Sequence, residues 1–256
     1  MTGTIFSGSG DAYDRFMGRY STQLAVRFAD FAGVLPPQRA LDVGAGTGAL
    51  TQELIGRLGE ENVAAAEPSP DYAATLRERF PGLDVREAPA EELPWEDGTF
   101  DEALAQLVVV FLNDVPGAVR ELARVTRPGG VVATTMWEFE GVEMMNALGE
   151  LRRRLAPGGF TPSAEYRDEP SLRKLFEAAG LRDVETTRIE MSVSYENVDE
   201  LWEPAIHVGG PGGPAVDAFT PEQLAQGRVI FEEALGNPTD GFELSGRAAA
   251  VRGVSG

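Results

Sequence analysis

The sequence has no cysteine and only one histidine, His207. Without thiols there is no disulfide, no thiolate nucleophile and no cysteine metal site, and a single histidine argues against a histidine-based zinc centre. We therefore expect no metal. No apolar run approaches the roughly 20 residues of a membrane-spanning helix, and the first residues lack a signal-peptide pattern. These absences predict a cytoplasmic protein that is not integral to a membrane.

Basic residues are also scarce, with 22 Lys and Arg against 41 Asp and Glu and a formal net charge of −19. Nucleic-acid binding needs clustered basic side chains on the phosphates. The basic run at residues 152–154 is more simply explained as a solvated helix face. The composition therefore disfavours a nucleic-acid partner. The length of 256 residues and the 43% hydrophobic content suit one large domain or a domain with a cap.

What is present is organised around residues 40–50. A short apolar run at 40–43 leads into Gly44, Gly46 and Gly48, and a helical apolar pattern follows at 50–58. The order predicts a strand, a tight glycine turn and a helix. Glycines allow unusual dihedrals and close approach to the backbone, and a helix N-terminus offers unpaired N–H groups. We therefore expect a nucleotide-like ligand at this loop.

The glycine loop alone leaves its ligand open. Residues 44–49 also satisfy the dinucleotide pattern G-x-G-x-x-G/A, and a plain glycine turn without a ligand is the alternative. However, about 40 residues precede the loop, and Asp42 lies in the strand itself. That carboxylate would repel a phosphate, whereas a sulfonium amino acid with an ammonium group would tolerate it.

A second acid follows at the expected distance. Residues 62–67 read as a second strand that ends at Glu67, 19 residues after Gly48. A carboxylate about 20 residues beyond such a loop accepts the hydroxyls of a ribose. Ser69 and Pro70 next to it resemble the start of a helix. Glu67 is thus either a ribose ligand or a capping charge.

The rest of the chain alternates strand and helix patterns. Further strands are expected at 83–86, 100–106, 131–136, 184–194 and 242–251, and residues 127–130 are expected to stop a helix before the fifth strand. This alternation predicts a parallel sheet with helices on both faces.

Two helical patterns, at 11–20 and 24–31, precede the first strand. The first has an apolar stripe made by Tyr13, Phe16, Met17 and Tyr20. These helices cover a sheet face, or the first one folds over the ligand as a lid that the cofactor orders.

Taken together, these patterns resemble the class I S-adenosylmethionine-dependent methyltransferases, most closely the quinone-biosynthesis-type (methyltransferase type 11) subgroup. Residues 41–48 are similar to the first motif of that family, and Glu67 to its ribose acid. Residues 90–101 are similar to its adenine loop and fourth-strand entry, and 127–130 to the turn before its fifth strand. The resemblance runs from about residue 13 to residue 251.

The resemblance implies an α/β fold: a Rossmann-like, doubly wound, seven-stranded sheet, mostly parallel with the last strand antiparallel, plus a helical cap. It implies a single methyltransferase domain over 1–256. Its expected parts are N-terminal helices and lid at 1–36, a cofactor-binding core at 37–137, the C-terminal part of the core at 138–195, a helical cap insertion at 196–236 and the last strand at 237–256.

The resemblance also implies S-adenosylmethionine as cofactor, with S-adenosylhomocysteine as product. The residues expected to bind it are Asp42, Gly44, Ala45, Gly46, Gly48, Glu67, Pro68, Ala90, Glu91, Gln106, Leu107, Tyr13, Arg19 and Tyr20. One position departs from the family: Pro89 stands where an aspartate often bonds adenine. Adenine contacts are therefore expected from the backbone near Ala90 or from Glu91.

The expected reaction is methyl transfer to a small, partly apolar molecule by in-line displacement. Candidate catalytic residues are His207, Tyr13 and Glu138, and the expected acceptor pocket contains Trp137, Trp202 and His207. A base is needed only if the acceptor is not readily ionised. The alternatives are a cofactor-binding module without methyl transfer and an NAD(P)-dependent oxidoreductase. The sequence leaves the oligomeric state open.

Overall fold

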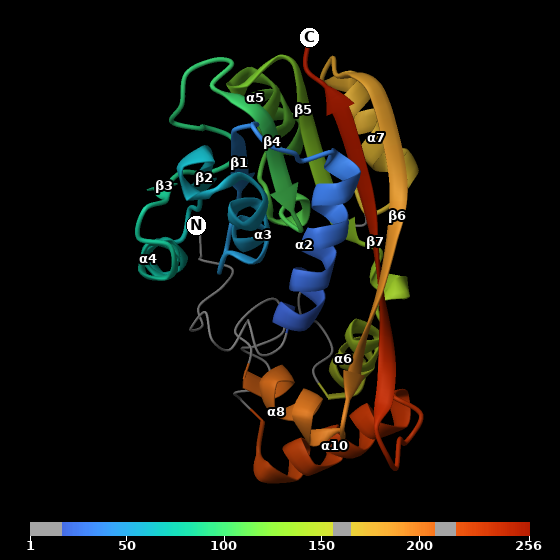
Figure 1. Ribbon diagram of the computed structural model, residues 1–256. Coiled ribbons are helices and arrows are strands. Elements are labelled where there is room, and N and C mark those ends of the chain that lie inside the picture. Colours follow the sequence, from blue (N-terminus) through green and yellow to red (C-terminus); the bar gives the residue numbers. More distant parts are fainter. Residues whose placement is uncertain (1–16, 156–164, 208–218) are drawn as a thin grey trace. The chain divides into compact units, whose positions relative to one another are not determined.

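The computed structural model describes residues 17–155, 165–207 and 219–256 (Figure 1). The chain divides into two compact units. The core unit comprises Ser21–Trp137, Ala164–Ile189 and Ala248–Gly256, and the second unit comprises Met1–Tyr20, Glu138–Ser163 and Glu190–Arg247. The single-domain organisation and its internal boundaries, inferred from the sequence, stay a prediction.

In the described part of the chain, seven strands form a sheet in the order β3-β2-β1-β4-β5-β7-β6. They are β1 (Ala40–Val43), β2 (Val63–Ala66), β3 (Asp84–Arg86), β4 (Phe100–Gln106), β5 (Thr126–Trp137), β6 (Arg182–Tyr195) and β7 (Phe242–Val254). Strands β1 to β5 pair in parallel, whereas β7 runs antiparallel to β5. The predicted seven-stranded sheet with an antiparallel last strand is confirmed.

The helices belong to both units. Those wholly or mainly in the core unit are α2 (Arg19–Ala32), α3 (Ala49–Leu58), α4 (Pro70–Arg79), α5 (Val115–Val125) and α7 (Glu169–Ala178). Those in the second unit are α6 (Glu143–Leu155), α8 (Asp199–His207) and α10 (Pro221–Ala234). Short 3-10 turns lie at Glu60–Asn62, Val109–Phe111 and Phe139–Gly141. No helix of the described residues is long and apolar enough to cross a membrane.

Strand alternation places helices on both faces of the sheet. In β1, Leu41 and Val43 belong to a buried apolar cluster that includes Val119 of α5 and Phe176 of α7. The residue between them, Asp42, instead bonds a side chain of α3. Because successive side chains of a strand point to opposite faces, α3 covers the face opposite α5 and α7. The core unit is therefore doubly wound, as predicted.

The fifth strand begins earlier than predicted. Helix α5 ends at Val125 and β5 starts at Thr126, so residues 127–130, expected as a turn, belong to the strand. A register shift between β4 and β5 accommodates the extra residues as a bulge does. A Cβ on Gly130 would lie 2.4 Å from the carbonyl oxygen of Asp101. Glycine is therefore required there for the close backbone approach.

The N-terminal helices also differ from the expectation. Residues 1–16 lie outside the described part, so the predicted helix at 11–20 and its lid role are not described. Tyr20, expected at the end of that first helix, instead lies in the first turn of α2, which continues unbroken to Ala32. Among the described residues, helical conformation runs without a break from Met17 to Ala32, so the expected interruption between residues 20 and 24 is absent.

Within the second unit, α6 and α10 pack closely. A Cβ on Gly227 of α10 would lie 2.9 Å from Cδ1 of Leu151 in α6, so the small residue sets the spacing of the helices. Helix α10 is capped at Thr220, whose side chain forms a capping box with Gln223. Helices α8 and α10 lie within the predicted insertion, and their role as a cap over the acceptor stays a prediction.

Candidate functional site

The glycine loop follows β1 directly. Gly44, Gly46 and Gly48 have φ angles of 70°, 57° and 95°, which other residues rarely adopt. A Cβ on Gly44 would lie 2.6 Å from Cγ2 of Val108, and one on Gly48 would lie 2.9 Å from Cδ2 of Leu76, whereas one on Gly46 would meet nothing within 4 Å. The outer two glycines therefore allow close packing, and Gly46 leaves open space where a ligand can approach the backbone.

Backbone bonds fix the start of this loop. The N–H groups of Gly44 and Ala45 both donate to the carbonyl oxygen of Ala66, at 2.8 and 3.1 Å. Since Ala66 ends β2, the loop is tied to the neighbouring strand before α3 begins. The predicted strand, glycine turn and helix are confirmed.

Asp42 is buried beneath the loop, on the α3 face of the sheet. Its Oδ2 accepts a hydrogen bond from Thr51 Oγ1 at 2.6 Å. Burial raises the pKa of Asp42 from 3.8 to about 7, while the bond from Thr51 lowers it in part. The carboxyl is thus half-protonated near neutral pH. A cation bound nearby would favour its charged form.

Glu67, just after β2, ties the loop to the next helix. Its Oε2 accepts from the N–H of Gly46 and its Oε1 from the N–H of Ser69, both at 2.8 Å. Burial raises the pKa of Glu67 despite these two bonds. A carboxylate has about four acceptor positions, so two remain for a ribose. The bond to Ser69, the N-cap of α4, supports the capping interpretation, and the ribose contact stays a prediction. Pro68 between them is exposed.

The expected adenine segment follows β3. Ala90 is buried, and Oε1 of Glu91 accepts from the N–H groups of Asn113 and Asp114 at 2.9 and 3.3 Å. Glu91 therefore joins this segment to the loop before α5. Its expected contact with adenine stays a prediction, as does that of the Ala90 backbone.

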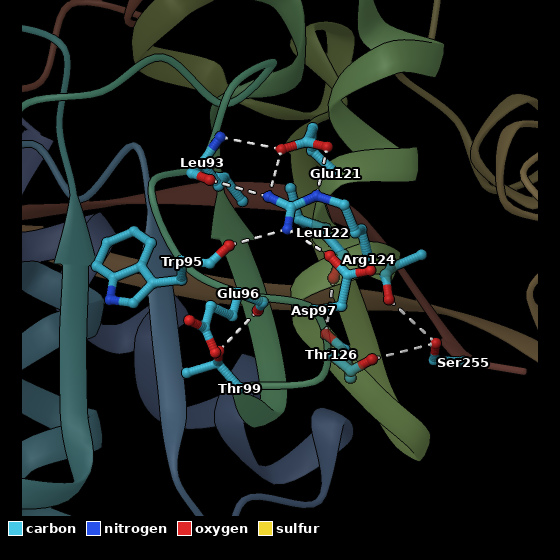
Figure 2. A network of polar contacts seen from close by, with 11 residues as sticks. Leu93, Trp95, Glu96, Asp97, Thr99, Glu121, Leu122, Arg124, Thr126 and Ser255 are labelled. Carbon is cyan, nitrogen blue, oxygen red and sulfur yellow. Dashed lines mark hydrogen bonds and ion pairs between the residues drawn. The ribbon is translucent and has the colours of Figure 1, made fainter.

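Arg124 of α5 holds the same segment, and sequence reasoning missed it (Figure 2). Its Nη1 donates to the carbonyl oxygen of Trp95 and to Asp97 Oδ1, both at 2.8 Å. Its Nη2 donates to the carbonyl oxygen of Leu93 at 2.9 Å and to Glu121 Oε2 at 2.8 Å, and its Nε donates to Glu121 Oε1 at 2.8 Å. All five guanidinium N–H groups are thus engaged. Three of them bond the segment directly, and two bond Glu121 of the same helix, whose Oε2 in turn accepts from the N–H of Leu93.

The end of β4 lies beside the glycine loop. Nε2 of Gln106 donates to the carbonyl oxygen of Ser21 in α2 at 3.1 Å. Leu107 has a φ of 64°, an uncommon angle for a non-glycine residue, and its N–H donates to Thr135 in β5. Strained backbone of this kind clusters at functional sites. The Gly44–Val108 approach brings this turn against the loop.

The expected N-terminal cofactor residues have other partners in the second unit. Arg19 pairs with Glu200 at 2.6 Å and donates to the carbonyl oxygen of Ser194 at 3.1 Å. Tyr20 is fully buried, and its hydroxyl donates to the carbonyl oxygen of Leu244 at 3.3 Å. Tyr13 lies outside the described residues. The cofactor roles expected for all three residues stay predictions.

The expected catalytic and acceptor residues are placed as follows. Glu138 pairs with Nε of Arg247 at 2.5 Å, which occupies the carboxylate that was expected to act as a base. Trp202 packs on Phe231, with ring centroids 5.4 Å apart, which fits core packing of the second unit. Trp137 is buried at the end of β5. His207 ends α8, and its side chain is outside the described part.

The fold and the loop define a class. A sheet that reverses its strand order beside β1, with a glycine loop there and an acid after β2, is a Rossmann-like nucleotide-binding arrangement. Ligands of such sheets bind at the carboxyl ends of the strands at this switch point. Asp42, Glu67 and the Gly44–Gly48 loop meet there, as the sequence predicted.

Comparison with known proteins narrows this class of nucleotide-binding folds to a family. Residues 41–134 match a family model described as a methyltransferase domain. The malonyl-[acyl-carrier protein] O-methyltransferase of Halorhodospira halophila is 37% identical over 210 residues, which cover 79% of this chain and 69% of that protein. The mitochondrial arginine-hydroxylase NDUFAF5 of Danio rerio is 28% identical over 190 residues, which cover 74% of this chain and 58% of that protein.

Solved structures share the fold. One is a type II methyltransferase structure from Anaeromyxobacter dehalogenans, with a TM-score of 0.60 and 20% identity, covering 90% of this chain and 95% of the other. Another is the phosphoethanolamine N-methyltransferase 2 of Haemonchus contortus with S-adenosylhomocysteine, with a TM-score of 0.57 and 16% identity, covering 96% and 56%. Because the 37% identical methyltransferase is matched over 69% of its own length, the chain belongs to the class I S-adenosylmethionine-dependent methyltransferases.

Proposed function

We propose that this enzyme transfers the methyl group of S-adenosylmethionine to a small, partly apolar acceptor by in-line displacement. When bound, the cofactor supplies a methyl group that its sulfonium already activates. The observation that supports this most directly is the open space at Gly46, where a Cβ would meet nothing within 4 Å. Buried polar groups of Asp42 and Glu67 lie beside that loop and fit the cofactor.

The residues of this site act by binding and orientation. The glycine loop allows close approach of the ligand to the backbone, and the Asp42 carboxylate favours a positive charge nearby. The remaining acceptor positions of Glu67 suit ribose hydroxyls. Proximity and orientation alone can contribute roughly 7–11 kcal/mol to catalysis.

A carboxylic acid is the acceptor class that we favour. The 37% identical relative is named malonyl-[acyl-carrier protein] O-methyltransferase, and a malonyl group carries a free carboxylate. A carboxylate is already ionised at neutral pH and needs no general base. This agrees with the Glu138–Arg247 ion pair, which leaves that carboxylate engaged. For less acidic acceptors, His207 and Tyr13 are the candidate bases.

The test is turnover with methyl-labelled S-adenosylmethionine and the purified full chain. The panel contains free carboxylic acids of increasing apolar length, phenols, quinones, amines and a malonyl thioester on a carrier protein. We expect label in a free small acid and release of S-adenosylhomocysteine. Labelling of the carrier-bound substrate alone would replace the small-molecule acceptor, and labelling of tRNA or DNA alone would refute it.

A second function is a cofactor-binding protein without methyl transfer. It is favoured by the relative named as an arginine hydroxylase, a reaction that is not methylation. Calorimetry separates the two functions. Binding of S-adenosylmethionine together with no product from any acceptor would support this second function. Binding of NAD(P)H instead would support the oxidoreductase alternative.

A further inference from the structure

The dipeptide Asp-Gly occurs twice in the sequence, at residues 97–98 and at residues 240–241. An aspartate before glycine is prone to an internal reaction, because glycine has no side chain to shield its backbone nitrogen from the neighbouring carboxyl group. Both aspartates are exposed to solvent: the side chain of Asp97 is 82% exposed, and Asp240 lies in an exposed bend. Exposure alone therefore does not distinguish the two positions.

The structure restrains both reacting groups of the first pair. Oδ1 of Asp97 accepts a hydrogen bond from Nη1 of Arg124 at 2.8 Å (Figure 2). The N–H of Gly98 donates to the carbonyl oxygen of Arg124 at 2.9 Å. The nitrogen of Gly98 can reach the carboxyl carbon of Asp97 only after such bonds open, and opening costs free energy. Arg124 therefore protects this pair with its side chain and with its backbone.

The second pair lacks both restraints. It lies in the connection between α10 and β7, where the N–H of Gly241 donates to no group of the described residues. In the same part of the chain, the carboxylate of Asp240 accepts only from Oγ1 of Thr239, at 3.3 Å. That distance is long for a bond from a hydroxyl. Exposed backbone without hydrogen bonds rearranges at little cost, so the two reacting groups of this pair are free to meet.

We propose that Asp240 converts spontaneously to isoaspartate in the folded protein, whereas Asp97 is protected. The nitrogen of Gly241 attacks Cγ of Asp240, a C–N bond forms, and one carboxyl oxygen leaves with two protons as water. Water then adds to either carbonyl carbon of the resulting succinimide ring and breaks the C–N bond there. Opening at the backbone carbonyl carbon leaves the chain linked through Cγ, with a free α-carboxylate. Opening at Cγ restores aspartate, and no step is an oxidation or a reduction.

The conversion has a structural consequence for the second unit. It lengthens the backbone by one carbon atom directly before Phe242, the first residue of β7. The ring of Phe242 stacks on Tyr195 of β6, with centroids 5.5 Å apart, and aromatic pairs across neighbouring strands stabilise a sheet. The extra atom shifts the start of β7, so we expect the converted protein to lose this stack and to unfold at a lower temperature.

The experiment is incubation of the purified full chain at neutral pH in water enriched in heavy oxygen. Each ring that reopens takes up one oxygen atom from the solvent. Digestion in ordinary water, chromatography and mass spectrometry then locate the label and the isoaspartate. In the folded protein we expect at least about tenfold more conversion at Asp240 than at Asp97. In urea both positions should convert at similar rates, because the fold no longer protects Asp97.

Two variants control the assignment. Asp240→Glu should abolish the signal at this position, because the longer side chain would have to close a less favourable six-membered ring. Arg124→Met removes the bond to Asp97 and should raise conversion there part of the way to its value in urea, since the backbone bond of Gly98 remains. The urea sample of the natural protein supplies the same comparison without any substitution.

Two outcomes would overturn the inference. One is an unconverted Asp240 in the folded protein after the urea sample has converted at both positions. The other is equal conversion of Asp240 and Asp97 in the folded protein, which would show that the bonds of Arg124 give no protection. Neither outcome depends on the cofactor or the acceptor, so this inference stands or fails separately from the proposed function.

Discussion

At the residue scale, Glu67 combines two tasks that the sequence could not separate. Glu67→Ala should lower affinity for S-adenosylmethionine by about 1.5–3 kcal/mol, the range of a hydrogen bond to a charged group. It should also destabilise the free protein, because the N–H groups of Gly46 and Ser69 lose their acceptor. Calorimetry and urea unfolding measure the two effects.

The control for Glu67 is Glu67→Gln, which keeps one acceptor oxygen in the same place. It should recover part of both losses. A Glu67→Ala variant that loses stability and binds S-adenosylmethionine normally would show that the residue only caps α4.

Asp42 makes binding depend on pH. Its pKa of about 7 means that the carboxyl must lose a proton at lower pH before it can attract a cation. Affinity for S-adenosylmethionine should therefore rise as pH increases from about 6 to about 8. Calorimetry across this range checks it. Asp42→Asn should bind more weakly at high pH and lose the pH dependence, and a natural protein with pH-independent affinity would contradict the expectation.

Glu102 of β4 makes folding depend on pH. The side chain is fully buried, and burial raises its pKa from 4.5 to about 7, which Gln38 and the charges of Arg252 and Arg57 oppose only in part. The pKa of Glu102 is higher in the folded than in the unfolded state. The protonated side chain therefore makes its full contribution to folding stability below about pH 4.5, and this contribution is lost as pH rises through about 7.

Glu102→Gln should remove this dependence. At pH 8 the variant should be more stable than the natural protein, by about 3 kcal/mol at most. Urea unfolding at pH 5 and pH 8 gives the difference. The Asp42 contribution, which has the same sign, is unchanged in this variant and serves as the internal reference. An equal pH slope in both proteins would contradict the prediction.

At the scale of elements, helix α5 positions the segment before β4 through Arg124. Arg124→Lys keeps the charge but loses the planar fork, so the bonds to Leu93 and Trp95 cannot all be made. We expect a loss of stability of about 1–3 kcal/mol, toward the lower end because the side chain is 31% exposed. Affinity for S-adenosylhomocysteine should fall as well.

The matched control is Arg120→Lys on the same helix. Arg120 lies 3.8 Å from Asp114, and its side chain is 61% exposed, so its replacement should change neither stability nor affinity. Urea unfolding and calorimetry apply to both variants. Equal effects of the two substitutions would show that Arg124 has no special role in the segment.

At the scale of elements, the sequence predicted those features whose residues lie close together in the chain. The glycine loop, Glu67 and most strand positions are read from residues close together in the chain. The bonds of Arg124 reach back to Leu93, and Gln106 bonds Ser21 from 85 residues away. No periodicity indicates such pairs. The early start of β5 depends on a bulge against β4, which is likewise a property of the paired strands.

At the scale of the whole molecule, the number of strands and the antiparallel last strand came from the family resemblance. Alternating strands and helices predict a parallel sheet, but periodicity does not place β7 between β5 and β6. The acceptor pocket was the hardest part to predict. Two of its expected residues, Trp137 and Trp202, belong to different units, and sequence patterns report only on residues that are close in the chain.

The net charge of −19 should affect the rate with an anionic acceptor. A negatively charged protein repels a carboxylate, and salt screens that repulsion. We expect kcat/KM for a carboxylic acid to increase as ionic strength rises from about 0.02 to about 0.2 M. A neutral acceptor serves as the control and should show little change. A decrease with salt for the acid would indicate that a local positive site dominates.

The division of the chain also limits how this enzyme can be recombined. The path passes between the units after Tyr20, Trp137, Ser163, Ile189 and Arg247. Two of these passages fall inside β6 and β7, so each of these strands is shared by both units. A chimaera that takes the second unit from a relative must therefore exchange three separate segments at once. Single-crossover shuffling inside β6 or β7 would join mismatched halves of a strand. Truncation past Tyr20 from the N-terminal end, or past Ala248 from the C-terminal end, would remove parts of both units.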